Sequence, residues 1–465
     1  MISIDTLPDE ALLVIFDHYM YDVQFGEERQ RAWLSLVHVC RRWRSIAFES
    51  PRRLNLRLVC RGGTPARDRL DVWPALPLII LVDVGDSIRC VDNIVAVLER
   101  SDRVCQINLV KPRSWDMEMI LAAMQQPFPE LTRLGLELER DGTVPVIPDS
   151  FLGGSAPRLE HLTLDGIPFP GLPRLLSSAT HLANLTLWNI PHSGYFSPAA
   201  MVNILSTLTS LSDLWLGFHS PRYFPDRASR RPHRSTRSVL PVLTTFRFNG
   251  VTEYLEDFVA RIDAPILNLL DITFFNDIVF YTPQLIRFIN RTPKSKALEE
   301  AHITLRNRAA SVNFSSQTSR YGNLKLEISC KGLDWQLSSL EQVCTSCLPP
   351  LSMLEDLYFY GDPQPDWKDN TDNGLWVELL RPFSAVKNLY LSDKVASRIA
   401  PALRELVEGR RTTEVLPTLQ HIFSGGLEFS GPVQEGIGKF VAARQVAGRP
   451  TAVSHWTNYQ QRRSY

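Results

Sequence analysis

A short apolar pattern recurs along most of this chain, and its spacing limits the possible folds more than any other feature. The pattern is L-x-x-L-x-L with conservative apolar replacements, and successive copies start 23 to 33 residues apart. The copies begin at Val104, Leu131, Leu159, Leu182, Leu211, Leu243, Leu267, Leu298, Tyr321, Leu354, Val386 and, more weakly, Leu419. In a β-sandwich of short strands, a new strand would begin about every 8–12 residues. The repeat therefore predicts one short strand and one longer return segment per copy.

Several return segments carry apolar residues at helical spacing, namely 198–208, 254–262, 283–290 and 398–408. Strands alternating with helices predict an α/β leucine-rich solenoid, a horseshoe with strands on the inner face and helices outside. Ile190, His219 and Val251 stand where such repeats usually place a turn-bonding asparagine. We therefore expect an irregular arc.

The expected boundaries follow the repeat. The solenoid should occupy residues 104–445, and residues 56–103 should connect to it, with an opening strand at 78–84. Residues 446–465 are expected to form a C-terminal tail.

Strand side chains alternate, so the residues between the repeated leucines should point away from the core. The candidate target-binding residues are Trp188, Asp213, Trp215, Arg247, Tyr358, Tyr360 and Tyr390. Exposed aromatic side chains are favoured as binding anchors. We expect Trp188 and Trp215 to lie on neighbouring strands as a diagonal pair, although neighbouring loops covering both is an open alternative.

Two insertions interrupt the repeat. Residues 220–238 contain six arginines and one acid, a composition that suits an acidic or phosphorylated partner, a nuclear address or a merely solvated loop. Residues 361–373 are acidic, without the spacing of a cation site.

The first fifty residues predict two amphipathic helices. One begins at Thr6-Leu7-Pro8-Asp9, where threonine can cap and proline is tolerated in the first turn. The other should span about residues 28–48 and end at Ser50-Pro51. So few residues rarely hold a core of their own, so these helices should pack on the rest of the chain or on another protein.

Residues 7–16, LPDEALLVIF, resemble the opening of an F-box, and residues 36–47, LVHVCRRWRSIA, resemble its second half. The following Ser50-Pro51-Arg52-Arg53-Leu54 is similar to a segment that often comes next in fungal F-box-like proteins, except that Asn55 replaces its tryptophan. The resemblance covers residues 4–55, about a tenth of the chain.

The resemblance implies an F-box domain at 4–55 that docks on a Skp-type adaptor of a cullin ubiquitin ligase core. The implied docking or supporting residues are Leu7, Pro8, Leu12, Ile15, Phe16, Leu36, Val39, Cys40, Trp43 and Ile46. The solenoid would then capture an unknown target protein for ubiquitin transfer. The alternative is a leucine-rich scaffold whose helical hairpin only caps the first repeat.

The charge and the cysteine content of the chain limit the partners and the cellular compartment that we expect. Fifty basic residues balance fifty acidic ones, so we expect no recruitment of nucleic acid or an anionic membrane. Seven scattered cysteines and the absence of a signal peptide favour a reducing compartment, cytoplasmic or nuclear.

No signature of catalysis is present. The chain lacks a P-loop, HExxH, GxSxG and GxGxxG, and Cys344-x-x-Cys347 has no second Cys/His pair nearby. We expect no enzymatic activity, cofactor or metal.

Overall fold

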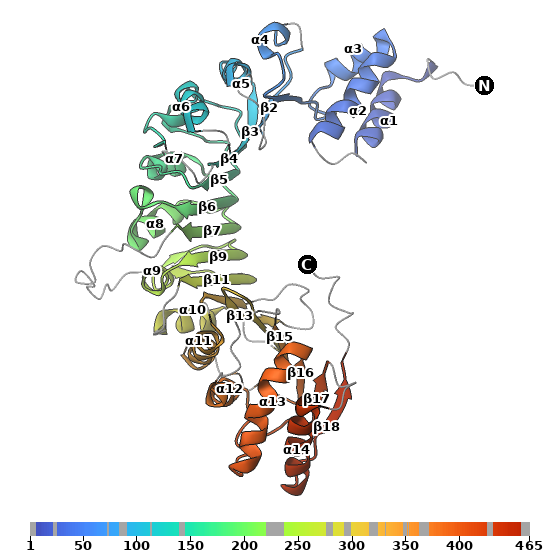
Figure 1. Ribbon diagram of the computed structural model, residues 1–465. Helices are drawn as coiled ribbons and strands as arrows, with labels where there is room; N and C mark the ends of the chain where they lie inside the picture. The colour runs from blue at the N-terminus through green and yellow to red at the C-terminus, as the bar shows by residue number, and fades with distance from the viewer. Residues whose placement is uncertain are drawn as a thin grey trace. The chain divides into compact units, whose positions relative to one another are not determined.

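The structure is a computed structural model that describes residues 6–21, 26–71, 74–82, 91–111, 114–138, 145–219, 237–275, 282–292, 299–315, 324–330, 332–346, 351, 353–361, 372–425 and 431–456. The chain forms two compact units, Met1–Tyr195 and Phe196–Tyr465. Figure 1 shows that both are built mainly from strands with helices beside them.

The first unit opens with a helical module of three helices, α1 (Asp9–Tyr21), α2 (Gly26–Val39) and α3 (Arg41–Glu49). Its buried side chains include Leu12, Phe16, Trp33, Leu36 and Ile46. The Phe16 and Trp43 rings contact each other with centroids 4.8 Å apart. The three helices therefore share one small core.

The predicted single helix over 28–48 is wrong, because the chain breaks at Cys40. That residue has an extended backbone (φ −155°, ψ 171°), and its Sγ accepts a hydrogen bond from the Trp43 backbone N–H at 3.4 Å. A residue that caps a helix takes extended dihedrals while its side chain satisfies a free N–H of the first turn. Cys40 thus ends one helix and starts the next.

The sheet of the first unit pairs its strands in parallel and in sequence order. The strands are β1 (Leu58–Arg61), β2 (Leu78–Val82), β3 (Val104–Val110), β4 (Arg133–Glu137), β5 (His161–Asp165) and β6 (Asn184–Ile190). The helices that follow strands are α4 (Ala66–Arg69), α5 (Val91–Leu98), α6 (Ser114–Ala123) and α7 (Leu172–Ser178). The strand expected at 78–84 is present as β2, but it does not open the sheet, because β1 precedes it and pairs with it in parallel.

The second unit continues the alternation of strand and helix. Its sheet runs in the order β7 (Asp213–Phe218), β9 (Thr245–Gly250), β11 (Leu269–Phe275), β14 (Leu324–Ser329), β13 (Ala310–Ser315), β12 (Glu300–Leu305), β15 (Asp356–Gly361), β16 (Asn388–Leu391), β17 (His421–Ser424) and β18 (Ala452–His455). Its helices are α8 (Pro198–Leu205), α9 (Thr252–Val259), α10 (Pro283–Arg291), α11 (Leu333–Ser346), α12 (Asn373–Leu380), α13 (Asp393–Glu408) and α14 (Pro432–Val446). A separate pair joins β8 (Ser238–Val239) to β10 (Ile262–Asp263).

The strand order of the second unit departs from the simple repeat at one place. Strands β12, β13 and β14 form an antiparallel meander, so that β14 pairs with β11 and β12 pairs with β15. Strand β13 was not predicted. Its alternating residues Ala310, Val312 and Phe314 are fully buried, which is the period of two that a strand requires and that the leucine pattern does not contain.

The sheet also reaches beyond the expected boundary at residue 445. Strand β18 lies within the segment that we expected to be a tail, and it pairs in parallel with β17. The pairing places Phe423 beside Ser454.

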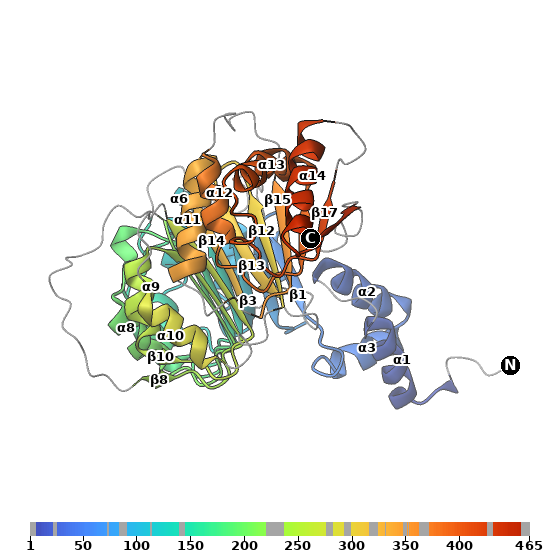
Figure 2. The same cartoon turned by 90° about the horizontal axis from the view of Figure 1, so that it is seen from below.

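In both units the helices cover one face of the sheet, as Figure 2 shows for α9 to α12 of the second unit. The repeated apolar residues face these helices: Phe246 and Phe248 of β9 are buried, whereas Arg247 and Asn249 are only half-buried. We call the face opposite the helices the open face. The predicted alternation is confirmed, and the chain has a mixed α/β fold consistent with a leucine-rich-repeat-like solenoid.

Among the residues that the structure describes, no helix has the length and apolar character needed to cross a membrane.

Candidate interaction surfaces

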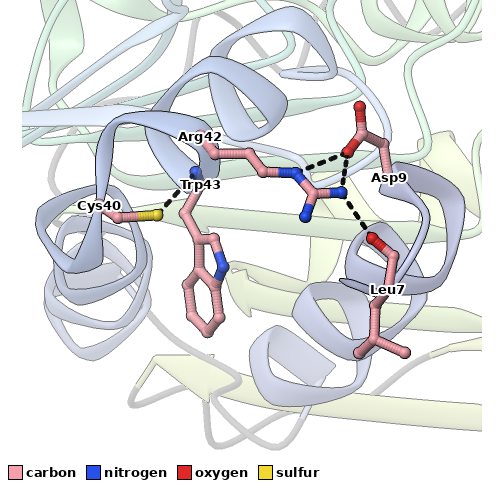
Figure 3. Close-up of polar contacts among 5 residues, drawn as sticks. All are labelled: Leu7, Asp9, Cys40, Arg42 and Trp43. Atoms are coloured by element: carbon pink, nitrogen blue, oxygen red, sulfur yellow. Dashed lines mark hydrogen bonds and ion pairs between the residues drawn. The ribbon is translucent and has the colours of Figure 1, made fainter. Parts of the chain in front are cut away.

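One ion pair ties together the two motif halves of the helical module (Figure 3). The Arg42 guanidinium donates to Asp9 Oδ1 at 2.6 and 3.1 Å and to the Leu7 backbone carbonyl at 2.5 Å. Asp9 begins α1 and Arg42 lies in the first turn of α3. The start of α1 is therefore fixed against the start of α3, beside Cys40 and Trp43.

The ten predicted docking residues divide by burial. Leu12, Phe16, Leu36 and Ile46 are buried, Leu7, Cys40 and Trp43 are half-buried, and Pro8, Ile15 and Val39 are exposed. The structure thus brings all ten into one module. The buried four build its core, and the exposed three can contact another protein.

Several large apolar side chains of the helical module are exposed to solvent. Ile15 is 43% exposed and Val39 is 60% exposed. Val14 and Tyr19 of α1 are exposed as well, and the motif did not single out Val14. The signal was present, because Leu12 to Phe16 are five consecutive apolar residues. A helix has about 3.6 residues per turn, so five in a row point to all of its sides and some must face away from the core.

The open face of the first unit carries Trp188 at the carboxyl end of β6. It pairs in register with Asp165 of β5, and the Asn189 side chain donates to Asp165 Oδ1 at 2.6 Å. Trp188 is half-buried. It belongs to the first unit and Trp215 to the second, so the diagonal pair of tryptophans stays a prediction.

On the open face of the second unit, charged and aromatic residues share one position of successive strands. The register aligns Trp215, Arg247, Asp271 and Lys325 across β7, β9, β11 and β14. Arg247 lies over the Trp215 ring at 5.3 Å, and Lys325 Nζ lies 3.6 Å from Asp271 Oδ1. Burial raises the pKa of Asp271, and the neighbouring Lys325 and Arg247 oppose that rise.

The predicted Asp213 lies two residues before Trp215 on β7 and is half-buried. Its Oδ2 accepts a hydrogen bond from the Ser212 hydroxyl at 2.6 Å. Asp213, Trp215 and Arg247 therefore lie close together on the adjacent strands β7 and β9.

Strands β12, β15, β16 and β17 carry aromatic side chains at the same register position. His302 of β12, Tyr358 of β15, Tyr390 of β16 and Phe423 of β17 stack in that order, with ring centroids 4.4, 4.1 and 4.6 Å apart. Their planes lie within 9° of parallel. We call these four residues the aromatic row. Tyr360, two residues after Tyr358, is parallel to it at 6.4 Å.

The sequence predicted Tyr358, Tyr360 and Tyr390 but missed His302 and Phe423. Both occupy the same place in their repeats as Tyr358 and Tyr390. Aligning the copies position by position, instead of choosing single outward aromatics, would have found them.

Burial is the main cause of the raised pKa values around the aromatic row. It raises the pKa of the Tyr358 and Tyr390 hydroxyls and of the Asp356 carboxyl. A hydrogen bond with His302 is the main reason that the pKa of Glu300 is lowered. The tyrosines therefore stay neutral at physiological pH and offer ring area and hydroxyl groups. Such a surface is suited to binding a partner.

The described residues contain no group of three or more His, Cys, Asp or Glu side chains placed to hold a metal ion. Cys344 is buried in α11, and Cys347 lies outside the described residues. The arginine-rich insertion is also outside them over 220–236, and so is the acidic insertion over 362–371. Arg237 is exposed, with its guanidinium 3.9 Å from Asp263.

No protein-family model matches the chain, and no curated protein matches it. Among solved structures it is similar to the leucine-rich repeat-containing protein LegL7 from Legionella pneumophila, with a TM-score of 0.27. The two share 11% sequence identity, and the match covers 82% of this chain and 97% of that one. So low a TM-score carries no weight, and the fold class rests on the strand order and burial described above.

Proposed function

We propose that this chain is a substrate-recognition adaptor of a cullin-type ubiquitin ligase. In this proposal the helical module docks on a Skp-type adaptor, and the open face of the repeats captures a target protein. The two F-box-like segments, residues 7–16 and 36–47, support the assignment. They pack against each other through Phe16 and Trp43 and through the Asp9–Arg42 ion pair.

The observation that carries the proposal is the apolar surface left on a module whose core is already complete. Ile15 and Val39 occupy motif positions and are exposed. Burying a fully exposed side chain of this kind is worth about 1.5–3 kcal/mol, so a protein that covers the 43% of Ile15 and the 60% of Val39 still exposed would gain about half of that for each. A partner protein is the natural source of that cover.

The adaptor itself would perform no covalent chemistry. By holding a target close to the ligase core, it would raise the effective concentration of target lysines at the conjugating enzyme. Its place of action would be the cytoplasm or the nucleus, where such ligases work.

Co-expression of the full chain with a Skp-type adaptor tests the docking step. The wild type should retain the adaptor through affinity purification, and Ile15→Asp combined with Val39→Asp should reduce retention at least tenfold. The reason is that two buried carboxylates would oppose the apolar contact.

The matched control is Met119→Asp combined with Val146→Asp, which places the same two charges at apolar positions of the first unit that are 44% and 54% exposed. It should retain the adaptor fully. Equal retention by the double variant and the control, with both folded by circular dichroism, would contradict docking through this surface.

One observation favours a second candidate, a repeat scaffold without a ubiquitin role. The Trp33 indole N–H donates to the Arg57 carbonyl at 3.1 Å, one residue before β1. This contact suits a module that only caps the first strand. In that case the wild type would retain no Skp-type adaptor in the same purification.

A further inference from the structure

The residue that follows β18 turns its side chain onto the tyrosines of the open face. The Trp456 ring centroid lies 6.2 Å from that of Tyr358, 5.8 Å from Tyr360 and 5.6 Å from Tyr390. The indole plane is tilted by 53° to 64° from the three tyrosine planes. Edge-on contacts of this kind are favourable between aromatic rings.

The indole lies where the pairing between β15 and β16 ends. That pairing ends at Phe359 and Leu391, so Tyr360 has no partner in β16, although it pairs with Thr304 of β12. Trp456 lies next to it and is held by its own backbone N–H, which donates to the Ser424 carbonyl at 3.1 Å. Tyr358, Tyr360 and Tyr390 thus form three sides of a site that an indole fills, which we call the tyrosine site.

The tyrosine site is separate from the hydrophobic core. Leu357, Phe359 and Leu389 face the helices and are completely buried, whereas Tyr358, Tyr360 and Tyr390 are half-buried on the open face. The four residues of β18 before Trp456 are all exposed. The indole is therefore the anchor of an otherwise exposed edge strand, and the core does not need it.

The surroundings define what else would fit. Glu300 and Asp356 lie on the same face beside the aromatic row, at the register position before His302 and Tyr358. Burial keeps the pKa of the Tyr358 hydroxyl raised, so that group stays neutral. A tryptophan side chain with a basic residue next to it would match the rings and the carboxylates together.

We propose that the tyrosine site is the anchor site for a tryptophan of a target peptide carrying neighbouring basic residues, and that Trp456 occupies this site in cis. The target must then displace Trp456. A site closed about nine-tenths of the time binds its ligand about tenfold more weakly than an open one. The proposal rests on the capture role of the open face and does not depend on adaptor docking.

A fluorescently labelled peptide Ser-Arg-Trp-Arg-Ser, titrated into the full-length protein and followed by fluorescence anisotropy, tests the proposal. The Trp456→Ala variant should bind it about tenfold more tightly than the wild type, because the cis occupant is gone. Trp456→Phe keeps an aromatic occupant and should bind as weakly as the wild type. Adding Tyr390→Ser to Trp456→Ala should abolish the gain.

Two controls make the outcome decisive. Trp335→Ala removes an exposed tryptophan of α11, 53% exposed, and should leave peptide binding unchanged. Replacing the central tryptophan of the peptide by alanine, or its arginines by glutamates, should weaken binding to Trp456→Ala at least tenfold.

Equal binding of the tryptophan and alanine peptides by Trp456→Ala would overturn the proposal, as would equal affinities of the wild type and Trp456→Ala. A large loss of thermal stability in Trp456→Ala, absent in Trp335→Ala, would assign the indole to the core instead. No ligase component enters these measurements, so the docking proposal can fail while this one holds, and the reverse.

Discussion

Arg444 of α14 is a fully buried cation surrounded by oxygen atoms of neighbouring segments. Its guanidinium donates to the Thr451 hydroxyl at 2.9 Å and to the carbonyls of Thr412 and Leu419, both at 3.1 Å. Burial lowers the pKa of this group, but an arginine remains charged. The side chain thus joins α14 to the segments that precede β17 and β18.

Arg444→Met should therefore destabilise the second unit. Methionine keeps most of the length but leaves the Thr412 carbonyl without its donor, which costs about 1–3 kcal/mol for an unsatisfied buried group. The Leu419 carbonyl keeps a hydrogen bond from the Thr451 hydroxyl at 3.3 Å. Denaturant unfolding measures the loss. Arg404→Met, on the exposed side of α13, is the control, and similar losses for both variants would contradict a bonding role for Arg444.

Glu300 gives a residue-scale prediction about pH. The pKa of its carboxyl is lowered from 4.5, mainly by the hydrogen bond with His302. A carboxyl with a lowered pKa in the folded state adds stability that is complete above its unfolded pKa and is lost as the pH falls toward its folded pKa. The melting-temperature difference between wild type and Glu300→Gln should thus be largest above pH 4.5 and shrink below it.

His302→Phe supplies the control, because it removes the donor and keeps a ring in the aromatic row. In that background the effect of Glu300→Gln should lose most of its pH dependence. An unchanged pH profile would place the cause of the shift elsewhere.

At the scale of single elements, two short stretches decide how the chain departs from its repeat. Cys40 divides one apolar run into α2 and α3. The meander of β12, β13 and β14 reverses the strand order within the second unit. In both places a local backbone choice changes which segments become neighbours, although the apolar pattern continues.

Shortening a buried leucine side chain of a strand should lower the free energy of unfolding by a measurable amount. Leu185 of β6 is completely buried and pairs in register with Leu162 of β5. Leu185→Ala should cost about 2–5 kcal/mol of unfolding free energy, because it removes buried methyl groups and leaves a cavity. Thr186→Ala, one residue on and facing the opposite side of the sheet, should cost much less. Equal costs in denaturant melts would mean that the strand faces are assigned the wrong way round.

At the scale of the whole molecule, the net formal charge is zero, so electrostatic attraction to a partner must come from local clusters. The strongest basic cluster in the sequence is residues 222–237, with six arginines. Such a cluster attracts anions at low salt and loses that attraction as salt screens it.

Replacing Arg227, Arg230, Arg231 and Arg234 by glutamine should lower the salt concentration at which the protein elutes from heparin. The matched control replaces four exposed arginines of the first unit by glutamine: Arg52, Arg53, Arg67 and Arg174. The two variants have the same net charge, so equal elution would show that the arginines of residues 222–237 have no special part in anion binding.

The sequence by itself determined the features that repeat. The copies of L-x-x-L-x-L located the strands, since each of these copies has its strand beginning within three residues of its start. The same alternation sorted residues between the core and the open face, because side chains of a strand must alternate. That alternation alone is enough to assign Trp215, Arg247, Tyr358 and Tyr390 to the open face.

Only the tertiary structure decided which strands are neighbours and which side chains meet on the open face. His302 joins the aromatic row because the meander sets β12 beside β15. Trp456 reaches the tyrosine site because β18 pairs with β17. Which distant strand becomes a neighbour depends on side-chain packing across the whole sheet, and the apolar pattern within one copy does not specify that choice.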